Sequence, residues 1–101
     1  MKYVVTHTGI FKKWLNKLPD MVTRKRITAR LRRIEERGHF GDSKALGGGL
    51  YEIREHHGAG YRIYYCHKGQ TVIILLIGGD KSSQQQDIEK ARVLMTIEGE
   101  E

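Results

Sequence analysis

Hydrophobic residues recur at a helical period in the first third of the chain and at a strand period in the middle third. The helical positions are Phe11, Trp14, Leu15 and Leu18, followed by Ile27, Leu31 and Ile34. A spacing of three to four residues places side chains on one face of a helix, so this pattern predicts two helices. Thr8 and Asp20 are favourable N-caps for them. Pro19 ends the first helix, and Gly38 is placed to end the second in a left-handed cap.

The middle of the chain predicts three strands. Residues 50–55 and 61–66 alternate between hydrophobic and polar, whereas residues 71–77 are almost continuously hydrophobic. Short links at 56–60 and around Lys68-Gly69 predict antiparallel hairpins. The continuous run predicts a central strand that is buried on both faces. Residues 2–6 predict a first strand, residues 39–49 a glycine-rich loop, and residues 84–96 a last helix with Ile88 and Ala91 on one side.

These elements follow one another as β-α-α-β-β-β-α. The order predicts an α+β domain in which two N-terminal helices pack on an antiparallel sheet and the helices are segregated to one face. A chain of 101 residues fits one such domain, which we place at residues 1–97. The acidic residues 98–101 are then a frayed tail.

Positive charge is concentrated in the region of the two predicted helices. The formal net charge is +6, and residues 12–37 contain ten basic residues against three acidic ones. Four arginines of the second helix are spaced three to four residues apart, so they project from a face other than the hydrophobic one: Arg26, Arg30, Arg33 and Arg37. A concentrated basic face favours a polyanion such as RNA, because binding releases counterions. A solvated helix face is the alternative interpretation.

Other compositional features indicate a cytoplasmic protein without a cofactor. Cys66 is the single cysteine, so no internal disulfide forms, as suits a reducing compartment. We find no N-terminal signal peptide, and the longest hydrophobic run, residues 72–77, is far shorter than the ~20 residues of a membrane span. One cysteine and scattered histidines do not have the spacing of a metal site. We therefore predict no metal, no cofactor and no membrane association.

Basic residues of the predicted sheet form the first candidate for chemistry. Alternation places Glu52 and Arg54 on one face of their strand, and Arg62 and Tyr64 on one face of the next. Pairing of the hydrophobic faces leaves these four residues on the open face, and Lys81 follows a flexible Gly78-Gly79 pair. Three cations that converge repel one another unless they bind an anion, so Arg54, Arg62 and Lys81 predict a phosphodiester site. The alternative is that each arginine pairs with a carboxylate, Glu52 or Glu55.

Histidines and a tyrosine are further candidates for the same site. Histidine titrates near neutral pH, so His39, His56 and His57 are alternative acid–base groups, although loop histidines are usually inert. Tyr64 is the tyrosine that alternation exposes, and it is the predicted stacking partner of an RNA base. The glycines at 47–49 do not form a phosphate-binding loop, because no Gly-Lys-Ser/Thr follows them.

An ordered set of motifs resembles a known toxin family over roughly residues 3–95. Its members are the hydrophobic helix before Asp20, the arginine-rich helix, and the segments Gly41-Asp42-Ser43-Lys44-Ala45-Leu46, Gly49-Leu50-Tyr51-Glu52-Ile53-Arg54, Gly60-Tyr61-Arg62-Ile63-Tyr64-Tyr65 and Leu75-Leu76-Ile77-Gly78-Gly79-Asp80-Lys81-Ser82-Ser83-Gln84. Together with the closing helix they resemble the RelE/ParE toxin superfamily, and within it the HigB-like addiction module killer proteins.

The resemblance implies the RelE-like fold and the toxin role of a type II toxin–antitoxin pair, with an antitoxin of the helix-turn-helix type. RelE-type members cleave mRNA in the ribosomal A site without a metal, whereas ParE-type members inhibit DNA gyrase. Arg62 matches the family's transition-state arginine. Arg54 and Lys81 match further basic positions, and Lys44 lies where the family often has a lysine before the sheet.

Two departures affect the proton-transfer roles. Glu52 stands at a position that is basic in RelE, and the C-terminal stacking tyrosine of RelE has no counterpart among residues 84–87. A histidine or Tyr64 is then the substitute. The presence of Arg54, Arg62 and Lys81 together favours a ribosome-dependent endoribonuclease that inhibits translation. The alternatives are a ParE-like gyrase inhibitor and a non-catalytic RNA-binding module.

Overall fold

The helical pattern of the first third forms the two expected helices. In a computed structural model that describes residues 2–98, the Thr8 hydroxyl accepts a hydrogen bond from the amide of Phe11 at 3.0 Å. A carboxylate oxygen of Asp20 accepts one from the amide of Val22 at 3.0 Å. Gly38 ends the second helix with a φ of 68°, in the left-handed region. Both predicted helices and their caps are confirmed.

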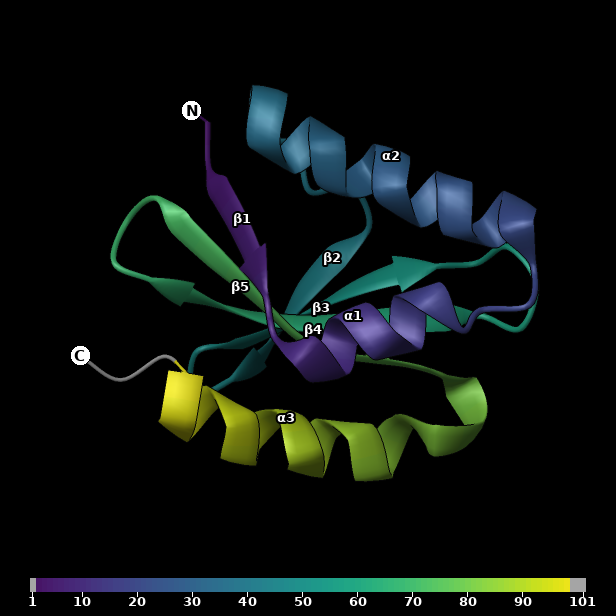
Figure 1. The fold of residues 1–101 in the computed structure, drawn as a ribbon. Helices are drawn as coiled ribbons and strands as arrows, with labels where there is room; N and C mark the ends of the chain where they lie inside the picture. Colours follow the sequence, from purple (N-terminus) through teal and green to yellow (C-terminus); the bar gives the residue numbers. More distant parts are fainter. Residues whose placement is uncertain (1, 99–101) are drawn as a thin grey trace.

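The complete order contains one strand more than the sequence predicts (Figure 1). The elements are β1 (Val4–His7), α1 (Gly9–Asn16), α2 (Met21–Arg37), β2 (Ser43–Gly47), β3 (Leu50–Glu55), β4 (Tyr61–Lys68), β5 (Val72–Asp80), the 3-10 helix η1 (Lys81–Ser83) and α3 (Gln84–Glu98). The hairpins β3–β4 and β4–β5 are antiparallel, as predicted. The predicted tail begins at the last residue of α3, and residues 99–101 lie outside the described part of the chain.

The prediction of a loop at residues 39–49 is wrong, because β2 lies within it. This strand pairs with β3 in antiparallel register, with Ser43 opposite Ile53 and Lys44 opposite Glu52. An irregularity between Ala45 and Gly47 then interrupts the pairing. The segment has neither a sustained alternation nor a hydrophobic run, so its strand conformation depends on hydrogen bonds from β3, which a local pattern does not report.

The prediction of an antiparallel sheet is also wrong in one respect. The strand order is β1-β5-β4-β3-β2, and β1 runs parallel to β5 while the other neighbours are antiparallel. The helices α1 and α2 form part of the long connection that a parallel pairing requires. The hydrophobic β5 is buried on both faces, as predicted, but β4 is the middle strand.

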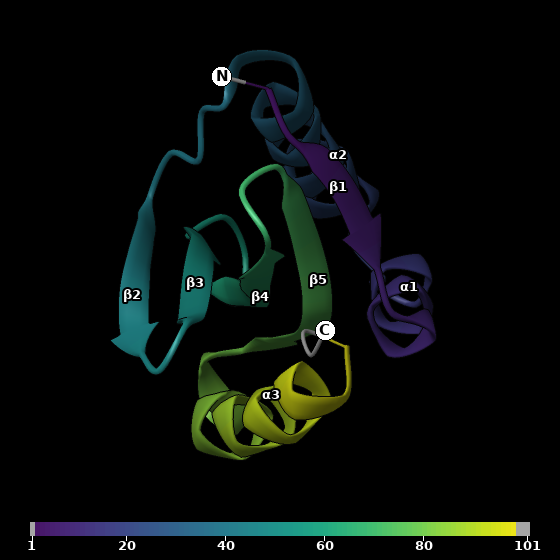
Figure 2. The ribbon, with the colours of Figure 1, turned by 90° about the vertical axis from the view of Figure 1, so that its left-hand side faces the viewer.

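Helices cover both faces of the sheet, and the prediction that they are segregated to one face is therefore wrong. Figure 2 shows α1 and α2 on one side and α3 on the other. The first core includes Phe11, Ile27 and Ile34 from α1 and α2, whereas the second includes Ala91 from α3. A hydrophobic stripe such as that of α3 shows that one side of the helix is buried. It does not show which face of the sheet the helix covers.

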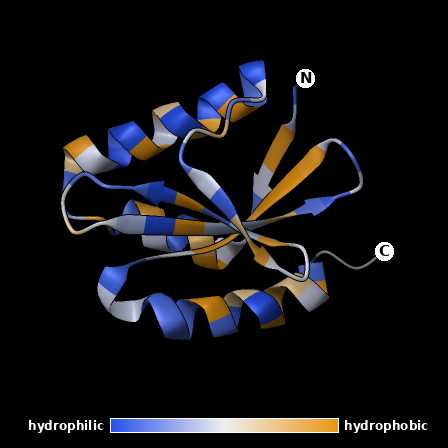
Figure 3. Ribbon diagram, turned by 180° about the vertical axis from the view of Figure 1, so that it is seen from behind, coloured by the Kyte–Doolittle hydropathy of each residue, from blue (hydrophilic) through white to orange (hydrophobic). Residues whose placement is uncertain are grey.

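Alternation along the strands distributes the hydrophobic side chains between these two cores. In β4, Ile63 and Tyr65 face α1 and α2, whereas Tyr64 and Cys66 face α3. In Figure 3, the ribbons of β1 and β5 are coloured mainly as hydrophobic, and that of α2 mainly as hydrophilic. Within residues 2–98, no helix has the length and hydrophobicity needed to cross a lipid bilayer. The architecture is an α+β fold in which helices cover both faces of a five-stranded mixed sheet.

Candidate functional site

The four polar residues predicted to share a strand face do share one. In the register of β3 and β4, Glu52 lies opposite Tyr64, and Arg54 lies opposite Arg62. Lys44 of β2 lies opposite Glu52, so the extra strand adds a lysine to the same face. The pairing of β2, β3 and β4 therefore places three of the predicted basic residues on one face of the sheet: Lys44, Arg54 and Arg62.

This face is not open, because α3 packs across it. Tyr64 is fully buried, and Glu52 is 1% exposed. The prediction that Tyr64 is exposed for base stacking is therefore wrong: alternation reports which face a side chain takes but not what covers that face. Burial raises the pKa of the Tyr64 phenol, and the nearby carboxylates of Glu52 and Asp87 raise it further. The phenol stays neutral near physiological pH, so it does not serve as a base there.

One buried carboxylate lies between the two arginines. Oε1 of Glu52 is 3.9 Å from Nε of Arg54, and Oε2 is 3.7 Å from Nε of Arg62. Gln84, the first residue of α3, donates a hydrogen bond from Nε2 to Oε2 of Glu52 at 3.1 Å. The alternative of carboxylate pairing is thus present in the structure. Glu52 lies within 3.9 Å of both arginines, and Arg54 has a second, closer carboxylate partner in Asp42 at 3.1 Å.

Several polar atoms of this cluster are buried without a hydrogen-bond partner among the described residues. They are Oε1 of Glu52, the Nε atoms of Arg54 and Arg62, and the hydroxyl of Tyr64. The separations of 3.7 and 3.9 Å between Nε and carboxylate are too long for hydrogen bonds. Folded proteins seldom leave buried polar atoms unpaired, so these atoms need partners such as a bound water or ion, or have a catalytic role.

Lys81 lies beside Arg62 at the end of the sheet. A terminal nitrogen of Arg62 donates to the carbonyl of Gly60 at 3.0 Å. The aliphatic stem of Lys81 packs on the same glycine, since a β-carbon at Gly60 would lie 3.0 Å from Cδ of Lys81. Lys81 is exposed, and no ion pair with it occurs within residues 2–98. Arg62 and the stem of Lys81 therefore both contact Gly60, and Arg62 lies opposite Arg54 in the strand register.

Asp42 connects Arg54 to a histidine. One carboxylate oxygen of Asp42 lies 3.1 Å from a terminal nitrogen of Arg54, and the other lies 2.6 Å from Nε2 of His56. The hydrogen bond with His56 lowers the pKa of Asp42, and the contact with Arg54 lowers it further. Asp42 precedes β2 in a loop, and no spacing in the sequence indicated that it reaches Arg54.

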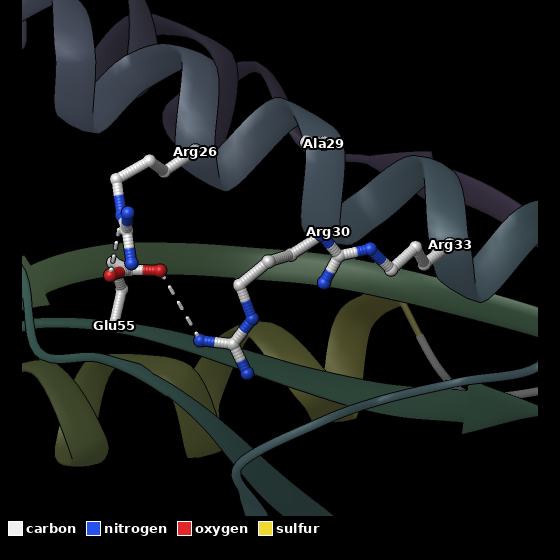
Figure 4. Close-up of a pocket in the computed structure, with 5 residues that line it drawn as sticks. All are labelled: Arg26, Ala29, Arg30, Arg33 and Glu55. Carbon is white, nitrogen blue, oxygen red and sulfur yellow. Dashed lines mark hydrogen bonds and ion pairs between the residues drawn. The ribbon is translucent and has the colours of Figure 1, made fainter.

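The predicted basic face of α2 divides into residues with different roles. Arg30 donates to the carbonyls of Phe40 and Asp42, both at 3.2 Å, and to that of Arg54, so it fastens α2 to the sheet. Arg26 places Nε 3.2 Å from Oε2 of the buried Glu55. Figure 4 shows Arg26 and Arg30 reaching Glu55 across a pocket of 180 Å³, whereas Arg33 does not reach it. Arg37 is exposed and lines none of the pockets that contain its neighbours.

The ion pairs of Glu55 with Arg26 and Arg30 make the stability of the fold dependent on pH. Burial alone would raise the pKa of Glu55, but the amide of His57 and the guanidiniums of Arg26 and Arg30 outweigh it and lower the pKa below its ordinary 4.5. A lowered pKa in the folded state stabilises the protein above about pH 4.5, and this stabilisation is lost as the pH falls through the lowered value.

We therefore expect Glu55→Gln to remove part of the acid sensitivity. Urea unfolding at pH 7, 5 and 3.5 should show a smaller loss of unfolding free energy below pH 5 in this variant than in the wild type. Glu35→Gln changes an exposed carboxylate on α2 and should leave the dependence unaltered. Equal acid sensitivity of Glu55→Gln and the wild type would contradict the assignment.

The other two histidines predicted as acid–base groups, His39 and His57, lie near this surface but not within one cluster. His57 is exposed, with Nε2 at 3.6 Å from Oδ2 of Asp20, and His39 lines a small pocket near the end of α2. No group of three or more His, Cys, Asp or Glu side chains suited to hold a metal occurs within residues 2–98. Cys66 is buried, and burial raises the pKa of its thiol.

The family is shown by comparison with known sequences. The model of the phage derived protein Gp49-like family (DUF891) matches residues 13–96. This chain belongs to the Gp49-like family. A relative from Haemophilus influenzae, described as an uncharacterized protein, is 39% identical over 94 residues, which cover 93% of this chain and 94% of the relative.

Solved structures place the Gp49-like chain in the RelE-like fold. A mutant of the E. coli toxin RelE in the free state superposes with a TM-score of 0.71 at 20% identity, covering 92% of this chain and 98% of that chain. The archaeal RelE–RelB complex from Pyrococcus horikoshii gives 0.60 at 24% identity, covering 80% and 97%. The intact E. coli RelBE toxin–antitoxin complex gives 0.63 at 21%, covering 77% and 95%. At these identities the likeness shows the fold.

Three residues of the candidate site have no signal in the local sequence pattern that assigns them a role there. Gln84 fixes Glu52 from the start of α3, Asp42 connects Arg54 to His56, and the buried Asp87 lies against Gly79. Each depends on α3 or β2 packing against β3, β4 or β5. The signal for Asp87 was a polar residue on the predicted packing face of a helix, because a carboxylate in such a position needs a partner, here the Ser83 hydroxyl at 2.5 Å.

Proposed function

We propose that this chain is the toxin of a type II toxin–antitoxin system, of the HigB-like killer protein branch, and that it is an endoribonuclease. Its action would be to cleave mRNA on the ribosome without a metal and so to stop translation. The observation that carries the proposal is the pairing of Arg54 with Arg62 across β3 and β4, together with the packing of the Lys81 stem on Gly60, in a RelE-like fold. The sequence resemblance to the toxin superfamily supports it independently.

In the proposed reaction the 2′-hydroxyl of the RNA attacks the adjacent phosphorus. The new bond between O2′ and phosphorus forms as the bond to O5′ breaks, and the products are a 2′,3′-cyclic phosphate and a 5′-hydroxyl. Arg62 stabilises the charge that develops on the non-bridging oxygens, and Arg54 holds the phosphate. Lys81 donates a proton to the leaving oxygen or neutralises its charge.

The proton of the 2′-hydroxyl needs an acceptor near these cations. Glu52 and Tyr64 are buried beneath α3, which removes them from direct contact with the substrate. His56 is exposed and is held by Asp42, which also contacts Arg54. We therefore assign proton acceptance to His56, a residue type that titrates near neutral pH. Lys44 and the exposed arginines Arg26, Arg33 and Arg37 are proposed to contact RNA or the ribosome.

An antitoxin is the proposed protein partner. Two of the solved structures that share this fold are complexes of a RelE protein with RelB. For this chain we propose a cognate antitoxin, of the helix-turn-helix type that the family resemblance implies. A small reading frame for such a protein next to the gene of this chain would support the assignment.

Brief induction in growing cells, followed by sequencing of RNA 5′ ends, tests the function. We expect growth arrest and new mRNA ends in phase with codons, both relieved by co-expression of the antitoxin. Intact transcripts together with a DNA damage response would overturn the nuclease and favour gyrase inhibition. Intact transcripts without that response, combined with RNA binding by the pure protein, would leave only the non-catalytic RNA-binding module.

A further inference from the structure

A second basic cleft lies where α2 meets the ends of β2 and β3. It has a volume of 340 Å³, and its lining includes Arg26, Arg33 and Arg54, with His56 and His57 alongside. Arg54 belongs to the candidate site as well, because its Nε faces Glu52. The cleft is therefore adjacent to the proposed catalytic arginines but is formed mainly by another element.

Positive charge exceeds negative charge in this cleft. Four arginines line it, with Arg30 as the fourth, whereas Asp42 and Glu55 are the only carboxylates in its lining. Two positive charges thus remain uncompensated before either histidine is protonated. Like charges held a few ångströms apart repel one another, and the repulsion grows where water is partly excluded. A bound anion removes this repulsion.

The arginines of the cleft differ in how many donors they have left. Arg30 is committed to Glu55 and to three backbone carbonyls. Arg26 contacts Glu55 through Nε, and no other hydrogen bond of its guanidinium occurs within residues 2–98. Arg33 is exposed and makes no ion pair or side-chain hydrogen bond within the same residues. Arg26 and Arg33 therefore keep donors that can serve a ligand.

We propose that this cleft binds a second backbone phosphate of RNA, beside the one that is cleaved. Arg33 and Arg26 are its principal donors, and Arg54 is shared by the two phosphate sites. The planar fork of an arginine can hold two oxygens of one phosphate. The identification of RNA as the bound polyanion rests on the proposed function. The binding of an anion by the cleft is inferred from charge and geometry and does not depend on that function.

The composition of the cleft favours a nucleic acid backbone over an acidic protein. Its lining consists of arginine, histidine, glycine, aspartate and glutamate, without a phenylalanine, tyrosine, tryptophan or aliphatic hydrophobic residue. Hot spots of protein interfaces are enriched in tryptophan and tyrosine as well as arginine, and the large aromatic side chains of a partner would meet no hydrophobic lining here. A phosphate requires only charge and hydrogen-bond donors, and both are present.

The test measures binding of the full chain to a single-stranded RNA whose 2′-hydroxyls are methylated, so that it cannot be cleaved. Fluorescence anisotropy over a series of salt concentrations gives the affinity and its salt dependence. We expect Arg33→Gln to weaken binding about tenfold and to reduce the slope of log affinity against log salt by about 0.7, the value for one contact to a single strand. Arg26→Gln combined with Arg33→Gln should reduce it by about twice as much.

Arg32→Gln is the matched control. Arg32 is an exposed neighbour on α2 that lines neither this cleft nor the pocket of Figure 4, so its replacement removes the same charge from another face. We expect it to change the affinity less than about twofold, since it removes no phosphate contact. Equal weakening by Arg32→Gln and Arg33→Gln would mean that overall charge alone attracts RNA, and it would overturn the proposal.

Titration with inorganic phosphate separates an RNA site from a site for a free anion. Nuclear magnetic resonance of the arginine Nε groups would follow Arg33 directly. If phosphate binds there while Arg33→Gln leaves RNA affinity unchanged, the cleft serves a free anion and the proposal is wrong. If the wild type binds the methylated RNA through Arg33 but never cleaves natural RNA, the nuclease fails and the phosphate cleft stands.

Discussion

Replacing Arg62 with alanine is expected to abolish growth arrest and to lower the rate of mRNA cleavage roughly 100- to 1,000-fold, the usual effect of removing one transition-state donor. Arg62 is held by the carbonyl of Gly60 and lies 3.7 Å from Glu52 with 11% of its side chain exposed, so its guanidinium is oriented before RNA arrives. Growth of induced cells and cleavage in a translating extract both measure the effect.

Two further variants separate chemistry from folding. Arg62 is a partner of the buried Glu52, so its loss also leaves a carboxylate less well compensated. Arg62→Lys keeps a positive charge there but loses the planar fork, and we expect a folded protein that still cleaves poorly. Arg32→Ala, on the outer face of α2, should cleave like the wild type. A folded Arg62→Ala that arrests growth as the wild type does would show that the residue has no such role.

Replacing Gly78 with alanine should destabilise the fold by about 3 kcal/mol, at the upper end of the usual effect of overpacking. A β-carbon at Gly78 would lie 2.2 Å from the ring of Trp14, so α1 would have to move away from β5. For a domain of this size, thermal unfolding should show a midpoint lower by roughly 10–20 °C.

Matched substitutions locate the cause of that effect. Gly9→Ala places a β-carbon in open space at the start of α1, and we expect no loss of stability from it. Trp14→Leu combined with Gly78→Ala should be less destabilised than the sum of the two single variants, because the smaller side chain makes room for the methyl group. An unchanged melting midpoint for Gly78→Ala would show that α1 does not pack as closely as described.

The Gly78-Gly79 pair shows what a local sequence pattern can and cannot predict about the structure. The sequence suggests a flexible link after the last strand, but both glycines lie inside β5 and are buried. Gly78 accommodates Trp14 on one face, and Gly79 accommodates the carboxylate of Asp87 on the other. Neither glycine has a positive φ. Each is required by a side chain of another element, Trp14 of α1 or Asp87 of α3, which the pattern of the strand itself does not reveal.

The candidate site shows the same division. Strand alternation correctly places Glu52, Arg54, Arg62 and Tyr64 on one face, because alternation is a local property of an extended backbone. The packing of α3 on that face is a tertiary event, and it converts Tyr64 from a predicted base-stacking residue into a buried core residue. It also turns Glu52 into the shared partner of the two arginines.

The sequence by itself determined the helices, their caps, the hairpins and the strand face that carries the arginines, since each depends on neighbours within a few residues. Only the tertiary structure decided the parallel pairing of β1 with β5, the extra strand β2, the position of α3, and the division of the α2 arginines between structural and available ones. Those features arise from contacts between different elements of the fold. Such contacts depend on how whole elements pack against one another, and the hydrophobic period of a single segment carries no information about that packing.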